Sequence, residues 1–191
     1  MKPLEKAFWD EMAEMLHIKE MSLKALHRMN AVVTRPELKK ALDAYRLDSQ
    51  KQGEKLREMF QAAEMFAREK KCDGMMGVLL KGQQIMQRTG PSPMLDAALL
   101  SLCRKITAYN LASQTTLVSW AKLAKAEPET MSTLKELLRI ETQADQRFLR
   151  ITSECDAEAA DQEVEPTRRA APAPPRKPTK ELAETARWGA W

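Results

Sequence analysis

The sequence predicts an all-α protein: a four-helix bundle with a short crossover helix and a flexible C-terminal tail. Among 191 residues there are 12 methionines but only 6 glycines, and aromatic residues make up 5%. Sheets favour β-branched and aromatic residues and need turn glycines, so this composition favours helices. Apolar residues also recur at helical spacing in five segments. A chain of this length can bury one sizeable core and carry an appendage.

The first helix is predicted over about residues 4–30, within which a lysine falls among the apolar positions. An unpaired ammonium is costly to bury, and such groups neutralise or find a carboxylate. We therefore expect Lys19 to meet an acid inside the bundle or to extend its long side chain to the surface. The predicted inner face consists of Phe8, Met12, Met15, Lys19, Leu23 and Leu26.

The second helix is predicted to start in "TRPE" (34–37) and to continue to about residue 67. Thr34 is expected to cap it, with Glu37 completing a capping box and Pro36 in the first turn. A polar connection, "REKKCDG", then leads to a shorter crossover helix over about residues 73–88. The predicted inner face of the second helix consists of Leu38, Leu42, Tyr45, Asp48, Gln52, Leu56 and Met59.

"TGPSP" (89–93) marks the next break, with Ser92 as the expected cap and Pro93 at the first helical position. A fourth helix is predicted over about residues 94–125 and a fifth over about residues 129–154, separated by the turn "AEPET". The inner face of the fourth is predicted to consist of Leu95, Leu99, Leu102, Ile106, Asn110, Leu117 and Trp120. The inner face of the fifth is predicted to consist of Leu134, Leu138, Glu141, Asp145 and Phe148.

Three regions follow from these elements: a bundle over 1–155, an acidic and then proline-rich linker over 156–178, and a short amphipathic peptide over 179–191. Leu182, Trp188 and Trp191 recur in the peptide at multiples of three residues, and a short helix would put the two tryptophans on one side. Exposed tryptophans reduce solubility unless they dock, and tryptophan is a favoured interface anchor. We expect these three residues to bind a partner, which is the chain's own bundle, a sister subunit or another protein.

Several functional classes are disfavoured by composition. Cys72, Cys103 and Cys155 are far apart, form no CxxC pair and lie near no histidine, so neither a zinc site nor a disulfide scaffold is expected. The N-terminal residues lack a signal peptide, and no apolar run approaches the roughly 20 residues that span a bilayer. The net charge is only +4 and no nucleic-acid motif occurs. The sequence thus predicts a cytoplasmic protein with no membrane or specific nucleic-acid partner.

The amino-acid sequence of several segments resembles that of the YciE/YciF family of bacterial stress-associated proteins. The resemblance covers about residues 2–154 and rests on "PLEKAFWDEMAEM", "TRPELKKALDAY", "KKCDGMMGVLLKG" and "MLDAALLSLCRKITAYNLASQ". It implies a ferritin-like bundle, often dimeric, with a pocket of carboxylates and histidines that can hold two metal ions. Such a site needs about four carboxylates plus histidines that project inward from four helices.

This chain departs from the family's ligand pattern on four of five helices. The resemblance places Lys19 at an inward glutamate, and the acid-pair slots of the third helix hold Leu80 and Lys81. Thr107, Ala108 and Asn110 stand where the family has a glutamate, a histidine and a glutamate. His17 and His27 lie off the inner face. We therefore predict no metal or other cofactor, and a vestigial pocket that consists of Lys19, Asp48, Gln52, Asn110, Glu141 and Asp145.

These observations favour a non-catalytic, homodimeric binding or assembly protein that contacts its partner through the tryptophan-containing tail. Lys19 would form a buried ion pair with Glu141, Asp145 or Asp48. The alternative is a stress-response oxidase or peroxide-handling protein that binds iron or manganese with the remaining acids.

Overall fold

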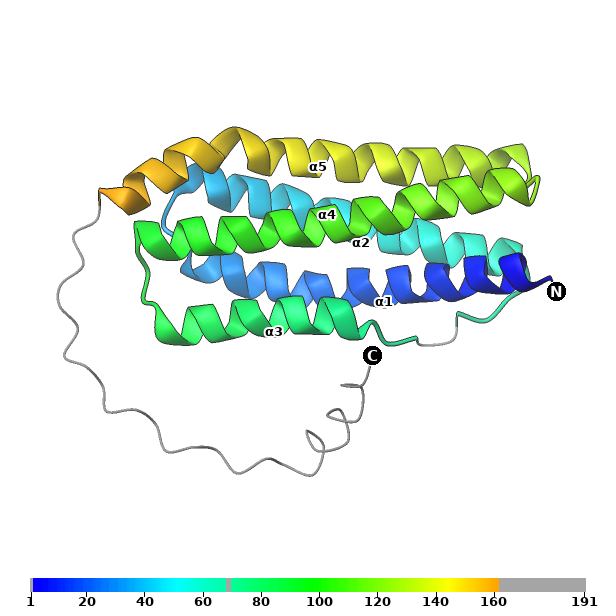
Figure 1. Ribbon diagram of the computed structural model, residues 1–191, viewed down its shortest axis with the longest axis horizontal. Helices are drawn as coiled ribbons and strands as arrows, with labels where there is room; N and C mark the ends of the chain where they lie inside the picture. The colour runs from blue at the N-terminus through cyan, green and yellow to red at the C-terminus, as the bar shows by residue number, and fades with distance from the viewer. Residues whose placement is uncertain (1, 68–69, 162–191) are drawn as a thin grey trace, which may run out of the picture.

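The computed structural model describes residues 2–67 and 70–161, and over these ranges the chain folds into five α-helices with no strand (Figure 1). The predicted all-α bundle with a short crossover helix is therefore confirmed. The flexible tail and the 179–191 peptide lie outside the described residues. The helices are α1 (Pro3–Val32), α2 (Pro36–Ala62), α3 (Asp73–Arg88), α4 (Pro93–Leu123) and α5 (Pro128–Ala160).

The four long helices all start at a proline, whose missing N–H and fixed φ suit the first turn. The cap predicted for α4 is present, because Ser92 Oγ accepts a hydrogen bond from the N–H of Leu95 at 3.2 Å. The capping box predicted for α2 is wrong. No side chain of its own segment caps α2, and Thr34 turns instead toward another helix.

The start of α2 is held by Asp96, a buried residue in the first turn of α4 that is 2% exposed. Its carboxylate accepts from the backbone N–H groups of Thr34, at 2.9 and 3.1 Å, and Arg35, at 2.8 Å. The Thr34 hydroxyl donates to the same carboxylate at 2.7 Å. Asp96 thereby satisfies donors that the helix start leaves free, and it ties the α1–α2 turn to α4.

Two helix ends differ from their predicted positions. α2 ends at Ala62 rather than near residue 67, because Glu64 adopts a left-handed conformation (φ 53°) and the N–H of Met65 closes the turn on the Phe60 carbonyl at 2.9 Å. α5 continues to Ala160, so the first residues of the segment predicted as a linker are helical.

The extension of α5 has a physical cause in a buried residue and an ion-pair cluster. Cys155 is fully packed, and Arg35 forms ion pairs with Glu154, at 2.5 Å, and with Glu158. These pairs raise the pKa of Arg35 above its ordinary value, first through the Glu158 hydrogen bond. The acidic composition that suggested a linker therefore contributes contacts between α5 and the start of α2.

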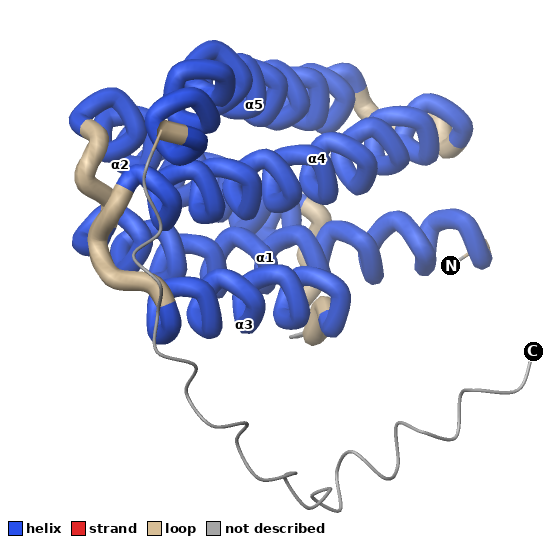
Figure 2. Tube along the Cα trace, turned by 60° about the vertical axis from the view of Figure 1, so that its left-hand side comes forward, coloured by secondary structure: helices blue, strands red, loops and turns tan. Residues whose placement is uncertain are grey.

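The long helices α1, α2, α4 and α5 run side by side, and α3 lies along the outside of α1 and α4 (Figures 1 and 2). Close approach of α3 requires Gly82, since a Cβ there would lie 2.3 Å from Cδ2 of Leu102 on α4. Within the described ranges, no helix carries an apolar stretch long enough to cross a membrane.

Two apolar clusters fill the bundle, one toward each end. Along α1 one cluster includes Phe8 to Leu16, and the other extends from Ile18 to the helix end. The same division recurs on α2, α4 and α5. Buried polar residues occupy the boundary on each helix, so the middle of the bundle is a polar layer. This layer consists of Lys19, Gln52, Asn110, Gln114 and Glu141.

Candidate functional site at the centre of the bundle

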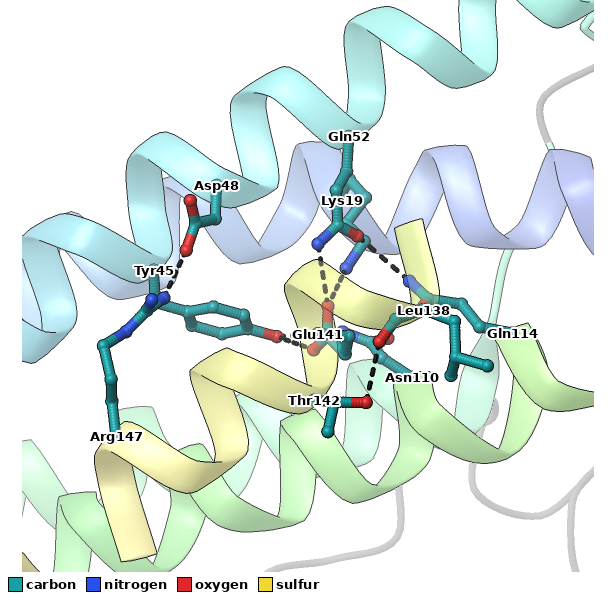
Figure 3. A network of polar contacts seen from close by, with 10 residues as sticks. All are labelled: Lys19, Tyr45, Asp48, Gln52, Asn110, Gln114, Leu138, Glu141, Thr142 and Arg147. Atoms are coloured by element: carbon teal, nitrogen blue, oxygen red, sulfur yellow. Dashed lines mark hydrogen bonds and ion pairs between the residues drawn. The ribbon is translucent and has the colours of Figure 1, made fainter. Parts of the chain in front are cut away.

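Side chains from α1, α2 and α4 converge on the carboxylate of Glu141, which α5 brings into the polar layer (Figure 3). Its Oε2 atom accepts hydrogen bonds from Nζ of Lys19 at 2.7 Å and Nε2 of Gln52 at 3.2 Å. Its Oε1 atom accepts from the hydroxyl of Tyr45 at 2.5 Å and Nδ2 of Asn110 at 3.1 Å. Both oxygens are thus engaged by donors of the protein itself.

The contact between Lys19 and Glu141 is an ion pair closed to solvent, because the two side chains are 1% and 0% exposed. A single charge at this depth would lose several kcal/mol of hydration, so each charge needs the other and further hydrogen bonds. The Lys19 ammonium also lies 6.0 Å from the ring centre of Tyr45. The side chain of Lys19 therefore ends in the core and does not extend to the surface.

Tyr45 joins the ion pair to the apolar cluster beside it. Its ring packs edge-on against Phe148 with 5.5 Å between ring centres, while its hydroxyl points at Glu141. Burial, followed by the negative charge of Glu141, raises the pKa of Tyr45 well above its ordinary value. The phenol therefore keeps its proton and acts as a donor to the carboxylate.

Two amides on α4 complete the layer. Asn110 Nδ2 also donates to the hydroxyl oxygen of Tyr45 at 2.9 Å, and Gln114 Nε2 donates to Oε1 of Gln52 at 3.0 Å. Lys19, Tyr45, Gln52 and Asn110 thus donate directly to the Glu141 carboxylate, and Gln114 is connected to it through Gln52. The amide oxygens of Asn110 and Gln114 have no protein partner. The network thus links all four long helices around one carboxylate.

Asp48 and Asp145, which were predicted to belong to the pocket, lie apart from the Lys19–Glu141 pair. Asp48 on α2 forms an ion pair with Arg147 on α5 (Figure 3). Asp145 accepts a hydrogen bond from Thr107 at 2.7 Å and lies 3.9 Å from Nε of Arg104. Both acids are half-buried. Each therefore has its own partner toward the edge of the bundle.

Sequence reasoning missed two residues, Tyr45 and Gln114, of the hydrogen-bond network around Glu141. Tyr45 was placed on the inner face of its helix but not in the pocket, and Gln114 was not singled out. The spacing held a signal for Gln114, because it follows Asn110 by one helical turn. The signal for Tyr45 was weaker, since an aromatic residue on an apolar face is usually core.

The two histidines, His17 and His27, lie off the inner face as expected, half-buried and exposed respectively. Across residues 2–67 and 70–161, no three His, Cys, Asp or Glu side chains are grouped so that they could hold a metal ion. Leu182, Trp188 and Trp191 fall outside the part of the chain that the structure describes.

Comparison with solved structures finds proteins of similar fold. The crystal structure of the Escherichia coli stress protein YciF is similar over 83% of this chain and 99% of its own, with 21% identity and a TM-score of 0.77. YcfI of Rhodopseudomonas palustris, for which a structural role has been suggested, is similar over 78% of this chain and 94% of its own. Its identity is 20% and its TM-score 0.74. No curated protein sequence matches the chain.

A domain family, described as a domain of unknown function (DUF892), matches residues 3–161. The match spans all five helices and agrees with the resemblance to the YciE/YciF proteins that the sequence motifs predict. The chain therefore belongs to the DUF892 family and has its ferritin-like bundle fold.

Proposed function

We propose that this protein is a non-catalytic binding or assembly protein, in which an internal ion pair replaces the metal ions of a ferritin-like bundle. The observation that supports the proposal most is the occupancy of Glu141. Its two carboxylate oxygens accept four hydrogen bonds from protein donors, one of them from the Lys19 ammonium. The positive charge at the centre is thus supplied by the chain itself.

The donor set around Glu141 does not fit a pair of divalent cations. Two such ions need several anionic oxygens and commonly imidazole nitrogens. The centre instead offers one carboxylate, and its neighbours direct N–H and O–H groups toward it. A cation placed there would meet the Lys19 ammonium and would displace the hydrogen bonds that compensate for burial of the pair.

Elemental analysis of the purified protein tests the proposal. We expect less than stoichiometric iron and manganese after incubation with Fe²⁺ or Mn²⁺ and desalting, in both the wild type and a Glu141→Ala variant. Asp156→Ala, an exposed acid on α5, is the matched control. Stoichiometric metal that disappears only in Glu141→Ala would contradict the proposal and support a metal-dependent oxidase.

The proposal assigns partner contact to the C-terminal peptide through Leu182, Trp188 and Trp191. Two tryptophans that follow a proline-rich segment are a pattern expected of a tethered anchor, in which aromatic residues at the end of a linker bind a partner. YciF is described as a stress protein and YcfI as a suggested structural protein, and both descriptions are compatible with a scaffold role. Three free, buried cysteines support a location in the reducing cytoplasm.

A pull-down that compares the full chain with a chain ending at residue 178 tests the peptide's role, and sedimentation of the same two samples tests the proposed homodimer. A partner retained by the full chain should be lost on truncation and in a Trp188→Ala/Trp191→Ala variant. If truncation removes no partner and leaves the oligomeric state unchanged, the assigned role of the peptide is wrong.

A further inference from the structure

A depression of about 500 Å³ opens at the end of α2, on the surface of the bundle. Phe60, Met65 and Phe66 supply its apolar surface, and Arg57 and Glu64 are polar residues beside them. The full lining of this α2-end depression is Arg57, Phe60, Gln61, Glu64, Met65, Phe66 and Ala67.

Phe66 is the most exposed of the large apolar residues in the described chain, at 92%. The turn after α2 puts it there, since Glu64 in the left-handed region reverses the backbone and Met65 hydrogen-bonds back to Phe60. An aromatic side chain left in water beside other apolar surface marks a contact site more often than a lone exposed leucine does. Within residues 2–67 and 70–161, the Phe66 side chain is therefore left almost fully uncovered.

We propose that residues 179–191 of the same chain dock in the α2-end depression through Leu182, Trp188 and Trp191. The inference deepens the proposed function, because it gives the partner-binding peptide a resting site on its own bundle. The two tryptophans are three residues apart in sequence and, with Leu182, supply apolar side chains that an apolar surface of this size can cover. A partner that binds the peptide would have to displace it from this site.

The linker is long enough for this contact. The end of α5 lies beside the start of α2, as the Arg35–Glu154 ion pair shows, so the peptide must cross the length of α2 (Figure 1). The 27 residues of α2 span about 40 Å at 1.5 Å per residue. Residues 162–178 include five prolines. That composition favours an extended chain, and 17 residues at about 3.1 Å each reach roughly 50 Å.

The chain's own peptide is favoured over other occupants by concentration and by charge. A tethered segment meets its site at an effective concentration on the order of millimolar, which exceeds that of a free partner. Beside its apolar surface the depression presents the anion Glu64, whereas the Arg57 guanidinium already pairs with Glu20 at 2.6 Å. The peptide carries a matching cation, Arg187, directly before Trp188.

Disulfide trapping tests the contact in the full chain. Gln61→Cys places a thiol at the depression, and Ala190→Cys places one between the two tryptophans of the peptide. The native cysteines are all buried and do not compete. The matched control is Gln87→Cys with Ala190→Cys, because Gln87 is an exposed glutamine of the last turns of α3, toward the bundle end where α5 finishes.

In a glutathione buffer, we expect the Gln61/Ala190 pair to form an intramolecular disulfide about ten-fold faster than the control pair, since docking raises the local thiol concentration. Trp188→Ala with Trp191→Ala should remove the difference. Equal rates for the two pairs would overturn the proposal. Disulfide-linked dimers as the main product would also overturn it, because the occupant would then be a second copy.

Limited proteolysis gives a second readout without new cysteines. Docking shields Phe66, so chymotryptic cleavage after Phe66 should be several-fold faster in a chain ending at residue 178, and Phe66→Ser identifies the product. An unchanged rate contradicts the proposal. Failure here would leave the ion-pair account intact, because metal content and the stability of Lys19 variants do not depend on where the peptide docks.

Discussion

Lys19 and Glu141 are 122 residues apart in the sequence, yet Nζ of the lysine lies 2.7 Å from Oε2 of the glutamate. The pair joins α1 to α5 between two apolar clusters, where neither charge reaches water. A buried pair of this kind adds little net stability over an apolar core, but it penalises every register that separates the charges. We hypothesise that it specifies how the four helices align.

The tyrosines provide a spectroscopic test of this environment, since the chain has only Tyr45 and Tyr109. The pKa of Tyr45 is raised by burial and by Glu141, and that of Tyr109 is raised first by its hydrogen bond with Cys72. Ultraviolet absorbance of tyrosinate should therefore show no ionisation step near pH 10 in the folded protein, whereas the urea-unfolded chain should show one at about pH 10. A native step near pH 10 would contradict the described environments.

The raised pKa of Tyr45 makes the free energy of unfolding depend on pH in the alkaline range. The folded state binds the Tyr45 proton more tightly than the unfolded chain, whose tyrosine pKa is about 10. This contribution is complete below pH 10 and is lost as the pH rises toward the folded-state pKa, so the free energy of unfolding falls with pH there. The free energy of unfolding of a Tyr45→Phe variant, measured by urea titration at a series of pH values, should fall less steeply above pH 10 than that of the wild type. If the free energies of unfolding of the two proteins change with pH in parallel, the pKa of Tyr45 is not raised as described.

Asp96 should be the most sensitive carboxylate outside the polar layer. Asp96→Asn replaces one acceptor oxygen with an amide and removes the charge that strengthens the bonds from Thr34 and Arg35. We expect a loss of roughly 2–3 kcal/mol in the free energy of unfolding, measured in urea. Asp156→Asn on the exposed face of α5 is the control and should stay within about 0.5 kcal/mol of wild type. Equal effects of the two substitutions would refute the anchoring role of Asp96.

Two glycines of α3 should respond to alanine with opposite signs. A Cβ at Gly82 would lie 2.3 Å from Leu102 Cδ2 and 3.3 Å from Met29 Cε, so α3 must move away or the core must shift, at about 1–3 kcal/mol. Gly77 has nothing within 4 Å, and Gly77→Ala should stabilise by up to about 1 kcal/mol through helix propensity. Thermal unfolding of both variants is the measurement, and a stabilising Gly82→Ala would mean that α3 does not pack as described.

Much of the fold could be predicted because each helix combines an apolar face with local start signals. Pro93 after Ser92 is such a signal, and the structure has that cap. The capping of α2 could not be predicted, because its acceptor, Asp96, lies more than 60 residues away in sequence. The helical end of α5 could not be predicted either, because its acidic composition is typical of a linker and the cation that pairs with Glu154 and Glu158, Arg35, is distant in sequence.

The centre of the site was predictable only in part. Helical periodicity predicted that Lys19 lies inside the bundle and that Asp48, Glu141 or Asp145 is its partner. Periodicity alone does not show which of these acids points most directly at Lys19, because their directions around the helix axis differ by only a fraction of a turn. Asp145 follows Glu141 by four residues, and this small rotation is enough to bring it to Thr107 instead. Asp48 similarly turns to Arg147, a cation that only the packed structure brings near.

A double-mutant cycle on Lys19 and Glu141 tests the central claim most directly. Lys19→Met and Glu141→Gln each leave one buried charge without its counterion, and each should lower the free energy of unfolding by roughly 3–5 kcal/mol. The double variant carries neither charge, so it should lose at least about 2 kcal/mol less than the sum of the single losses. Additive losses, or a Lys19→Met protein that unfolds at the wild-type urea midpoint, would contradict the account.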